Sequence, residues 1–476
     1  MVQFIRWTRS RVLFGMLALL LLTSWAAADE PTEETRMLAQ VDVTGAIAEL
    51  GIPIHAHLLD AAGQEYVLTL VSEQALQQRQ LSYRIVDAVA ALKPDEWYLL
   101  AYERRQGARQ QAVTIMTVLY DDGKYLLVRA TPSQAERLAN LGFEIAWLRK
   151  RPMILRVSER LRTKAITPLP LIQNLIDQVT QSTLSAYTSR LSGVTPAIIG
   201  GASYTITTRH TDSGTPIQKA TQYVYEHLQA LGLAVRYQNW NNDDYESSGR
   251  NVIGELRGTT RPGEIVLITA HLDDMPASGL APGADDNASG AAGVMVAADV
   301  MSAYTFERTV RFVFFTGEEI DFLGSYAYAE SVYNANQNIV AVYNLDMIAW
   351  DNKGGPDFRL YTRLPSNPGY AGDLALAQLL VQVINTYGLS SSLTPLIISN
   401  GYDFSDHASF WGFGYAALWA IEDDDDFNPY YHTKNDKLQY LNMSYFTAVV
   451  KASLGSIAHQ AVPIEQSGNS YILWTK

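Results

Sequence analysis

The sequence predicts a mixed α/β protein. We expect a three-layer α/β/α domain with a mostly parallel, mixed sheet, preceded by a small α+β domain. Residues 265–268, 310–315 and 339–343 are short, continuous apolar runs, and such runs are typical of strands covered on both faces of a sheet. Earlier in the chain, a strand-helix-strand pattern occurs twice. The 476 residues leave room for both domains.

The first residues have the pattern of a secretory signal peptide. Three arginines precede an apolar run over residues 12–22, and Ala26-x-Ala28 supplies the small residues of a cleavage site. The run has about half of the roughly 20 residues that a spanning helix needs. We therefore assign residues 1–28 to a signal peptide cleaved after Ala28. A secreted or periplasmic protein is expected, with no stable membrane insertion after cleavage.

Composition excludes several classes of partner and chemistry. The formal net charge of −13 argues against nucleic acid or an anionic membrane surface as partner. The chain contains no cysteine, so disulfides, thiolate metal ligands and a cysteine nucleophile are all excluded.

Residues 29–165 are assigned to the first domain together with its linker. Thr131 and Pro132 are a good helix start, with Thr131 as N-cap and proline in the first turn. The two modules are predicted at residues 66–70, 72–81 and 83–85, and again at residues 125–128, 131–141 and 143–145.

The first domain has no catalytic cluster in its sequence. His55 and His57 alternate in an apolar stretch, and we interpret them as the exposed face of a strand, with metal binding as the alternative. We interpret the domain as a prodomain or accessory domain that restrains activity until it is removed. The polar, proline-containing stretch over residues 159–170 is the expected boundary or processing site.

The second domain is assigned to residues 166–476. Thr215 and Pro216 are expected to cap a helix whose apolar residues recur at helical spacing and which Gly232 ends. Residues 288–301 are expected to form a helix of small residues that lies close against the sheet.

Two histidines and three carboxylates occur in a fixed order: His271, Asp285, Glu319, Asp346 and His432. This is a ligand set for a pair of zinc ions that share one bridging carboxylate. Three of the five follow apolar strands, and open α/β sheets bind ligands in the crevice beyond the carboxyl ends of their strands. Glu318 precedes a ligand directly, as a general base would. The set predicts metal-assisted hydrolysis.

Three other polar groups have a less specific pattern. Asp273 is expected to accept the second ring N–H of a zinc-bound His271, with a surface aspartate as the alternative. The four aspartates from Asp423 to Asp426 are interpreted as a solvated acidic loop, with attraction of a substrate ammonium group or calcium binding as alternatives. Asp406 and His407 are interpreted as structural or supporting groups, since five ligands already fill two metal sites.

Six segments together carry a family resemblance. They are HLDD at 271–274, PGADDNASG at 282–290, TGEE at 316–319, NLDM at 344–347, GYDFSDHA at 401–408 and NPYYHT at 428–433. In this order they resemble the two-zinc leucyl aminopeptidases secreted by bacteria, within the wider aminopeptidase and glutamate carboxypeptidase superfamily. The resemblance covers residues 171–461, and the first domain lies outside it.

The resemblance implies two Zn²⁺ ions per chain. Asp285 would bridge them, with Glu319 and His432 on one ion and His271 and Asp346 on the other. It also implies a non-proline cis peptide at Asp285–Asp286.

The implied activity is removal of N-terminal amino acids from peptides or proteins through a zinc-bridging hydroxide. Glu318 would act as general base, and the Tyr402 hydroxyl would donate to the developing oxyanion. The chain departs from the family where relatives carry a pair of cysteines, because Asn400 and Phe404 stand there. After His432 it also has Thr433 and Lys434 in place of the Asp-Thr that is frequent in relatives.

Other functions remain as alternatives. A carboxypeptidase or dipeptidase of the same fold needs a basic residue to hold the substrate carboxylate, for which Arg209 and Arg250 are candidates. A glutaminyl cyclase-like transferase would use one zinc. A binding protein without activity would lack ligands, and this chain keeps all of them.

Overall fold

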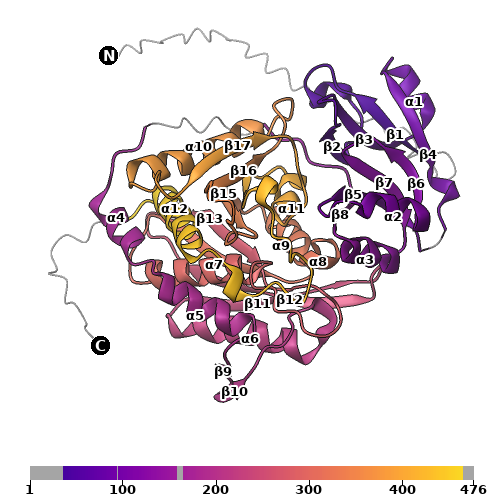
Figure 1. The fold of residues 1–476 in the computed structure, drawn as a ribbon. Coiled ribbons are helices and arrows are strands. Elements are labelled where there is room, and N and C mark those ends of the chain that lie inside the picture. Colours follow the sequence, from indigo (N-terminus) through magenta and orange to yellow (C-terminus); the bar gives the residue numbers. More distant parts are fainter. Residues whose placement is uncertain (1–35, 94, 158–164, 465–476) are drawn as a thin grey trace, which may run out of the picture.

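The computed structural model describes residues 36–93, 95–157 and 165–464. The predicted signal peptide and the first half of the predicted linker lie outside these residues. Figure 1 shows a smaller N-terminal domain beside a larger three-layer domain, which confirms the predicted fold class. Among the described residues, no helix has both the length and the apolar character needed to cross a membrane.

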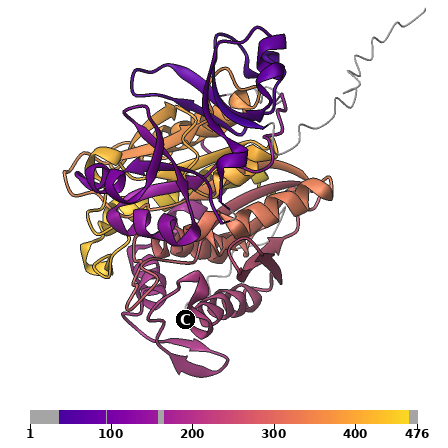
Figure 2. The same ribbon diagram turned by 90° about the vertical axis from the view of Figure 1, so that its right-hand side faces the viewer.

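The N-terminal domain consists of two modules, each with a four-stranded antiparallel sheet over its described residues. Its elements are β1 (Met37–Asp42), β2 (Ala56–Leu59), β3 (Glu65–Val71), α1 (Glu73–Gln78), β4 (Tyr83–Ala88), β5 (Trp97–Glu103), α2 (Ala108–Ile115), β6 (Thr117–Asp121), β7 (Tyr125–Ala130), α3 (Pro132–Leu141) and β8 (Phe143–Trp147). The strand orders are β2-β3-β1-β4 and β6-β7-β5-β8. The predicted units are β3-α1-β4 and β7-α3-β8, and Figure 2 shows the two modules one above the other. Thr131 caps α3 as expected.

The larger domain is built on a mixed sheet that has eight strands among the described residues. They are β11 (Ala234–Asn242), β12 (Ser247–Leu256), β13 (Arg261–His271), β14 (Arg308–Phe315), β15 (Asn338–Leu345), β16 (Asp357–Thr362), β17 (Thr394–Ser399) and β18 (Ala417–Ile421). The order is β11-β12-β14-β13-β15-β18-β16-β17. The central pairs β14-β13, β13-β15 and β15-β18 are parallel, so their carboxyl ends meet at one edge.

Helices cover both faces of this sheet. They are α4 (Pro170–Asp177), α5 (Gln181–Leu191), α6 (Thr215–Ala230), α7 (Ala288–Met301), α8 (Glu318–Asp321), α9 (Leu323–Asn334), α10 (Tyr370–Thr386), α11 (His407–Gly412) and α12 (Met443–Ala461). Along β13, Val266 and Ile268 pack in one core with α7 and α12, whereas Ile265 and Leu267 pack in another with α9 and α11. The alternation follows from the two-residue period of a strand. Helix α6 begins at Thr215 as expected, although its N-cap is Gly214, which gives no side-chain cap.

Helix α7 lies close to the sheet because its residues are small. Asn287 caps it by accepting the Gly290 N–H. A Cβ at Gly290 would lie 2.3 Å from the carbonyl oxygen of Leu345, which ends β15. Glycine at this position therefore permits close contact between the helix and the strand end.

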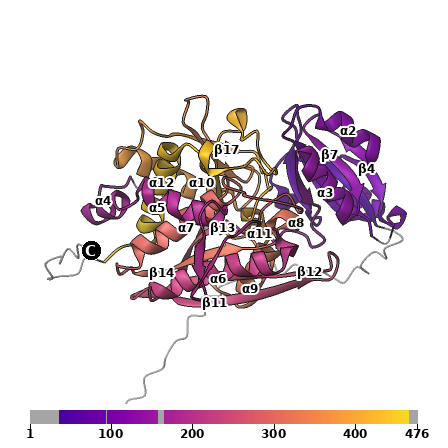
Figure 3. The same ribbon diagram turned by 60° about the horizontal axis from the view of Figure 1, so that its bottom comes forward.

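The N-terminal domain packs against the larger domain near α8 and α11 (Figure 3). Its apolar face shares one buried cluster with Tyr402, Phe404 and Trp419. The prediction that His55 and His57 are exposed is wrong, since their exposed fractions are 2% and 5%. They are buried because His55 bonds the Arg149 carbonyl oxygen and His57 bonds Glu65 close to Ser366 of the larger domain.

Candidate metal centre

Five titratable side chains meet at the carboxyl edge of the parallel strands. His271 ends β13, Asp346 follows β15, and Glu319 lies in α8 directly after β14. Asp286 comes from the loop before α7, and His432 from the loop after β18. Topology thus brings together residues that are far apart in the sequence.

These side chains form two groups that share one carboxylate. In the first, the His271 Nε2 atom lies 3.1 Å from Asp346 Oδ1 and 3.4 Å from Asp286 Oδ1. In the second, the His432 Nε2 atom lies 2.9 Å from Glu319 Oε2 and 3.3 Å from Asp286 Oδ2. The two oxygens of Asp286 therefore face different histidines, as a bridging ligand requires.

The residue between the histidines is Asp286, and the prediction of Asp285 is wrong in position by one residue. The Asp285 carboxylate faces the other way, where it accepts hydrogen bonds from the Ala349 N–H and the Asn428 amide at 3.0 Å each. The non-proline cis peptide likewise joins Asp286 to Asn287, one bond later than predicted. Two adjacent aspartates look alike in a sequence, and only the backbone direction decides which one faces the histidines.

The residues present fit a pair of zinc ions. Two atoms that each lie about 2.0–2.1 Å from one tetrahedral ion are about 3.3 Å apart, and the four nitrogen–oxygen distances in the two groups are close to this value. Glu319 Oε1 and His432 Nδ1 are buried without a hydrogen-bond partner. In the described part of the chain, the ion pairs of Asp286, Glu319 and Asp346 are all with histidines. Buried carboxylates need positive charge to compensate for their lost hydration, and bound cations would supply that charge.

Burial and neighbouring carboxylates shift the pKa values of the residues in the site. Burial and the charge of Asp286 raise the pKa of Glu319 to about 7. Burial opposes the charge of His432, yet the carboxylates of Glu319 and Asp286 raise its pKa to about 10. Burial also raises the pKa of Glu318 well above its usual range, and the charges of Asp346 and Glu319 add to the effect. Bound cations would reverse these shifts by stabilising the carboxylates.

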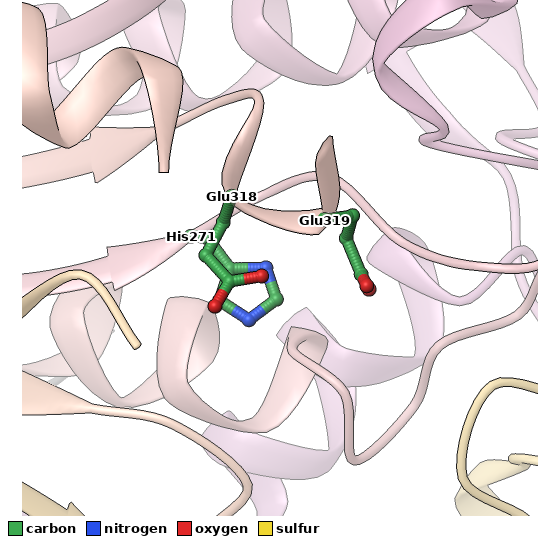
Figure 4. Close-up of side chains that lie close together, drawn as sticks. All are labelled: His271, Glu318 and Glu319. Carbon is green, nitrogen blue, oxygen red and sulfur yellow. The ribbon is translucent and has the colours of Figure 1, made fainter. Parts of the chain in front are cut away.

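Glu318 lies beside His271 and Glu319, as Figure 4 shows. Gly317 precedes it with a φ of +81°, a conformation that glycine adopts readily. The predicted role of Asp273 changes in detail. The His271 Nδ1 atom lies 3.7 Å from Asp273 Oδ1, near the predicted contact, and 3.2 Å from the Asp273 carbonyl oxygen. The other carboxylate oxygen of Asp273 accepts the Gly317 and Glu319 N–H groups at 2.9 and 3.2 Å. Asp273 therefore holds the turn that carries both glutamates.

Tyr402 is buried, and its hydroxyl already has a partner. The hydroxyl donates a hydrogen bond to the Glu144 carboxylate of the N-terminal domain. Three tyrosines surround its ring, namely Tyr102 and Tyr125 of the N-terminal domain and Tyr361 of β16. No pattern in the sequence connects Glu144 with this site.

Of the supporting residues, His407 agrees with its predicted role and the four aspartates do not. His407 is buried, and burial lowers its pKa to about 3. Its ring bonds the Tyr402 carbonyl oxygen, which agrees with a structural role. The interpretation of the four aspartates as a solvated loop is wrong for three of them, since only the Asp425 side chain is exposed, at 89%. Arg359 pairs with Asp423, Asp424 and Asp425, and Asp426 accepts backbone N–H groups from Asn352 and Lys353.

Sequence reasoning missed two further supporting residues. The Asp436 carboxylate accepts the N–H groups of Asp285 and Asp286 and so fixes the loop that carries the shared carboxylate. The Ser405 hydroxyl donates to Asp346 Oδ2 at 2.6 Å. The proximity of Asp436 to His432 in the sequence was a usable signal, whereas Ser405 had none beyond its place in the segment at 401–408.

Comparison with known proteins places this arrangement in context. The profile of Peptidase family M28 matches residues 251–456. A probable leucine aminopeptidase from the fungus Arthroderma otae is 28% identical over 270 residues, which are 53% of this chain and 68% of that protein.

Two solved structures share the fold. The LapA aminopeptidase of Legionella pneumophila aligns with a TM-score of 0.57 at 17% identity, over 78% of this chain and 100% of that one. BSAP, a zinc aminopeptidase from Bacillus subtilis, aligns with a TM-score of 0.50 at 14% identity, over 61% of this chain and 97% of that one.

The family profile and the leucine aminopeptidase relative support the prediction of an enzyme of the hydrolase class that acts as an aminopeptidase, and the two solved structures show its fold. This sequence relative comes from a fungus, so it leaves the bacterial part of the predicted resemblance unconfirmed.

Proposed function

Since residues 251–456 carry the sequence pattern of Peptidase family M28, we propose that this chain is an exported metallo-exopeptidase with two zinc ions. Its substrates would be the N-termini of peptides or proteins, from which it removes one amino acid at a time. The observation that carries the proposal is the pair of histidine-carboxylate groups joined through Asp286.

The residues that would hold the ions are those of the two groups. His271 and Asp346 would hold one ion, Glu319 and His432 the other, and Asp286 both. Two such ions would make a water molecule more acidic and would stabilise negative charge on the substrate carbonyl oxygen.

The chain's own residues would move the protons. Glu318 is the carboxylate beside both groups that takes no part in the ligand pairs. It would accept a proton from the attacking water and pass it to the leaving amine. The Tyr402 hydroxyl would donate to the developing oxyanion once its bond to Glu144 is exchanged for the substrate.

The positions of two arginines disfavour cleavage from the carboxyl end. Arg209 is buried, pairs with Asp274 and donates to backbone carbonyls, including that of Leu272. Arg250 donates to Thr221 and to the carbonyl oxygen of Gln218. Both candidates for binding a substrate carboxylate are therefore committed to structural contacts, and an aminopeptidase is favoured.

Export and processing complete the proposal. Cleavage after Ala28 would release a secreted or periplasmic protein, and the domain that ends near residue 165 would act as a prodomain. Mass spectrometry of the exported protein checks both. In the exported form that still carries the N-terminal domain, a first residue other than Asp29 would contradict the assigned signal.

The principal test is hydrolysis of free and N-acetylated peptides, with zinc content measured on the same sample. We expect hydrolysis of the free peptides alone and two zinc ions per chain. Glu318→Gln should keep both ions and lose roughly 10²–10⁴-fold of kcat. Cleavage of acetylated peptides would remove the aminopeptidase assignment, and one zinc with cyclisation of N-terminal glutamine would favour the transferase.

A further inference from the structure

One arginine of the N-terminal domain inserts its guanidinium into a pocket of the larger domain. Arg104 directly follows β5, and its side chain is 5% exposed. Its Nη1 atom lies 2.9 Å from Asp424 Oδ1. The guanidinium carbon lies 4.3 Å from the centre of the Phe427 ring and 5.6 Å from that of Tyr402. A carboxylate and two aromatic rings of the larger domain thus surround this cation.

The pocket adjoins the metal centre. The Tyr431 ring stacks on the His432 imidazole with 3.7 Å between centroids, and Phe427 packs against Tyr431 at 5.1 Å. On another side, Tyr402 shares a buried cluster with Met347, the residue after Asp346. The aromatic walls of the pocket are therefore each one residue removed from a side chain that would hold zinc, Phe427 through Tyr431 and Tyr402 through Met347.

We propose that this pocket binds the cationic side chain of an N-terminal arginine or lysine in the substrate, and that Arg104 occupies it in the full chain. The proposal rests on the proposed aminopeptidase function. It makes Asp424 the residue that determines specificity, with Phe427 and Tyr402 as aromatic walls.

Charge favours a cation over an apolar side chain in this pocket. Asp424 is largely buried, with a side chain that is 15% exposed. Its partners within the larger domain are Tyr361 and the guanidinium of Arg359, which also pairs with Asp423 and Asp425. One cation is thus shared among three carboxylates, and a leucine side chain would leave that excess unbalanced. An arginine or lysine would balance it and also gain from the aromatic faces.

Arg104 arrives together with a carboxylate that takes the catalytic tyrosine. Its Nη2 atom lies 2.8 Å from Glu144 Oε1, and Glu144 also accepts the Tyr402 hydroxyl. The pair therefore fills the pocket and engages the hydroxyl at once. As long as both contacts persist, a substrate competes with the N-terminal domain for the same groups.

The first experiment uses the full chain with Arg104→Ala, and Arg109→Ala serves as the matched control. Arg109 belongs to the same domain but pairs with Glu103 and Asp121, inside that domain. Hydrolysis of the 4-nitroanilides of L-arginine, L-lysine and L-leucine is measured. We expect Arg104→Ala to raise kcat/KM for arginine and lysine by about tenfold or more, and to favour them over leucine by a similar factor. Arg109→Ala should match the wild type.

The second experiment adds Asp424→Asn to the Arg104→Ala chain, with Asp425→Asn as its control. The Asp425 side chain is 89% exposed, so the same change there leaves the pocket intact. The preference for arginine over leucine should disappear with Asp424→Asn and persist with Asp425→Asn. A preference for leucine in Arg104→Ala, or one that survives Asp424→Asn, overturns the pocket assignment while leaving the aminopeptidase function in place.

Binding without turnover separates the two proposals. The rise in unfolding temperature with L-argininamide and L-leucinamide is measured on the folded Arg104→Ala chain. A larger rise with L-argininamide supports the pocket even where no anilide is hydrolysed, an outcome that would sink only the proposed function. Equal rises overturn the pocket. Should Arg104→Ala fail to fold, Glu144→Gln, which keeps the Arg104 cation but weakens its ion pair, is tested for the same preference.

Discussion

Two buried clusters of charge lie on either side of Tyr402 and Tyr431, and they differ in where their cations come from. In the metal centre, the ion pairs of Asp286, Glu319 and Asp346 over the described residues are with two histidines. In the neighbouring cluster, Asp424 meets Arg359 from β16 and Arg104 from the N-terminal domain. One cluster is balanced by the chain itself, and the other is not.

The difference shows how a buried cluster indicates a missing ligand. Carboxylates remain buried only if a positive charge or hydrogen bonds compensate for lost hydration. Where arginines supply that charge, the cluster is structural or occupied. Glu319 Oε1 is buried without a hydrogen-bond partner among the described residues, and a cation from outside the chain would compensate its charge. Four predictions test this contrast, beginning with the largest effect.

The largest effect is expected from Asp286→Asn. Its two oxygens face both histidines, so loss of one negative charge should remove at least one zinc and lower kcat/KM by more than about 10³-fold. Asp285→Asn is the matched control, because the Asp285 carboxylate accepts supporting hydrogen bonds, and it should lose only about 10–100-fold. Zinc content and peptide hydrolysis are measured on both. The reverse order would restore Asp285 as the shared ligand.

Metal removal should destabilise the protein markedly. The unbalanced carboxylates repel one another once cations leave, and zinc at 1,000 times its Kd contributes about 4 kcal/mol to the free energy of unfolding. The free energy of unfolding by urea is measured on protein treated with a chelator and on protein with added zinc, and the two values are compared. If chelation left the unfolding midpoint in place, the centre would not depend on metal for its charge balance.

A smaller loss is expected when the balanced cluster loses a cation. Arg359→Met removes the partner of Asp423, Asp424 and Asp425, with an expected cost of about 2 kcal/mol because the side chains are partly exposed. Zinc content should not change. Lys93→Met breaks the exposed pair with Glu96 and should cost less than about 0.5 kcal/mol. Equal losses in the two variants would show that the Arg359 cluster is no more important than a surface pair.

The effect that is smallest at neutral pH concerns His55, a buried histidine whose charged neighbours are arginines. Burial lowers the pKa of His55 to about 4, and Arg36 and Arg149 disfavour its charged form further. The unfolded chain binds a proton below about pH 6.5, so the free energy of unfolding should fall as pH drops from there to pH 4. The loss should reach about 2–3 kcal/mol. Unfolding of the wild type and His55→Gln is compared across this range. Parallel curves would mean that His55 titrates normally.

The sequence predicted the elements better than the contacts between them. Helix α7 spans the predicted residues 288–301, and the apolar run at 265–268 lies inside β13. These elements follow from local patterns of apolar and small residues. The strand ends then led to His271, Asp346 and Glu319, because a parallel sheet gathers its carboxyl ends at one edge.

What the sequence could not supply depended on direction and on distant partners. Asp285 and Asp286 are adjacent and chemically identical, and the backbone turn alone decides which one faces the histidines. Arg359 lies more than sixty residues before the aspartates that it neutralises. The acidic run by itself therefore predicted a solvated loop. Glu144 belongs to another domain, and no local pattern relates it to Tyr402.

Because α7 lies in close contact with β15, the geometry of the metal centre depends on Gly290, a residue without a side chain. Any side chain at position 290 would collide with the Leu345 carbonyl, one residue before Asp346, and with the Asn287 amide, one residue after Asp286. In a random mutant library, this position should therefore tolerate substitution as poorly as a zinc ligand. An engineer who redesigns specificity around Asp424 would have to leave Gly290 untouched.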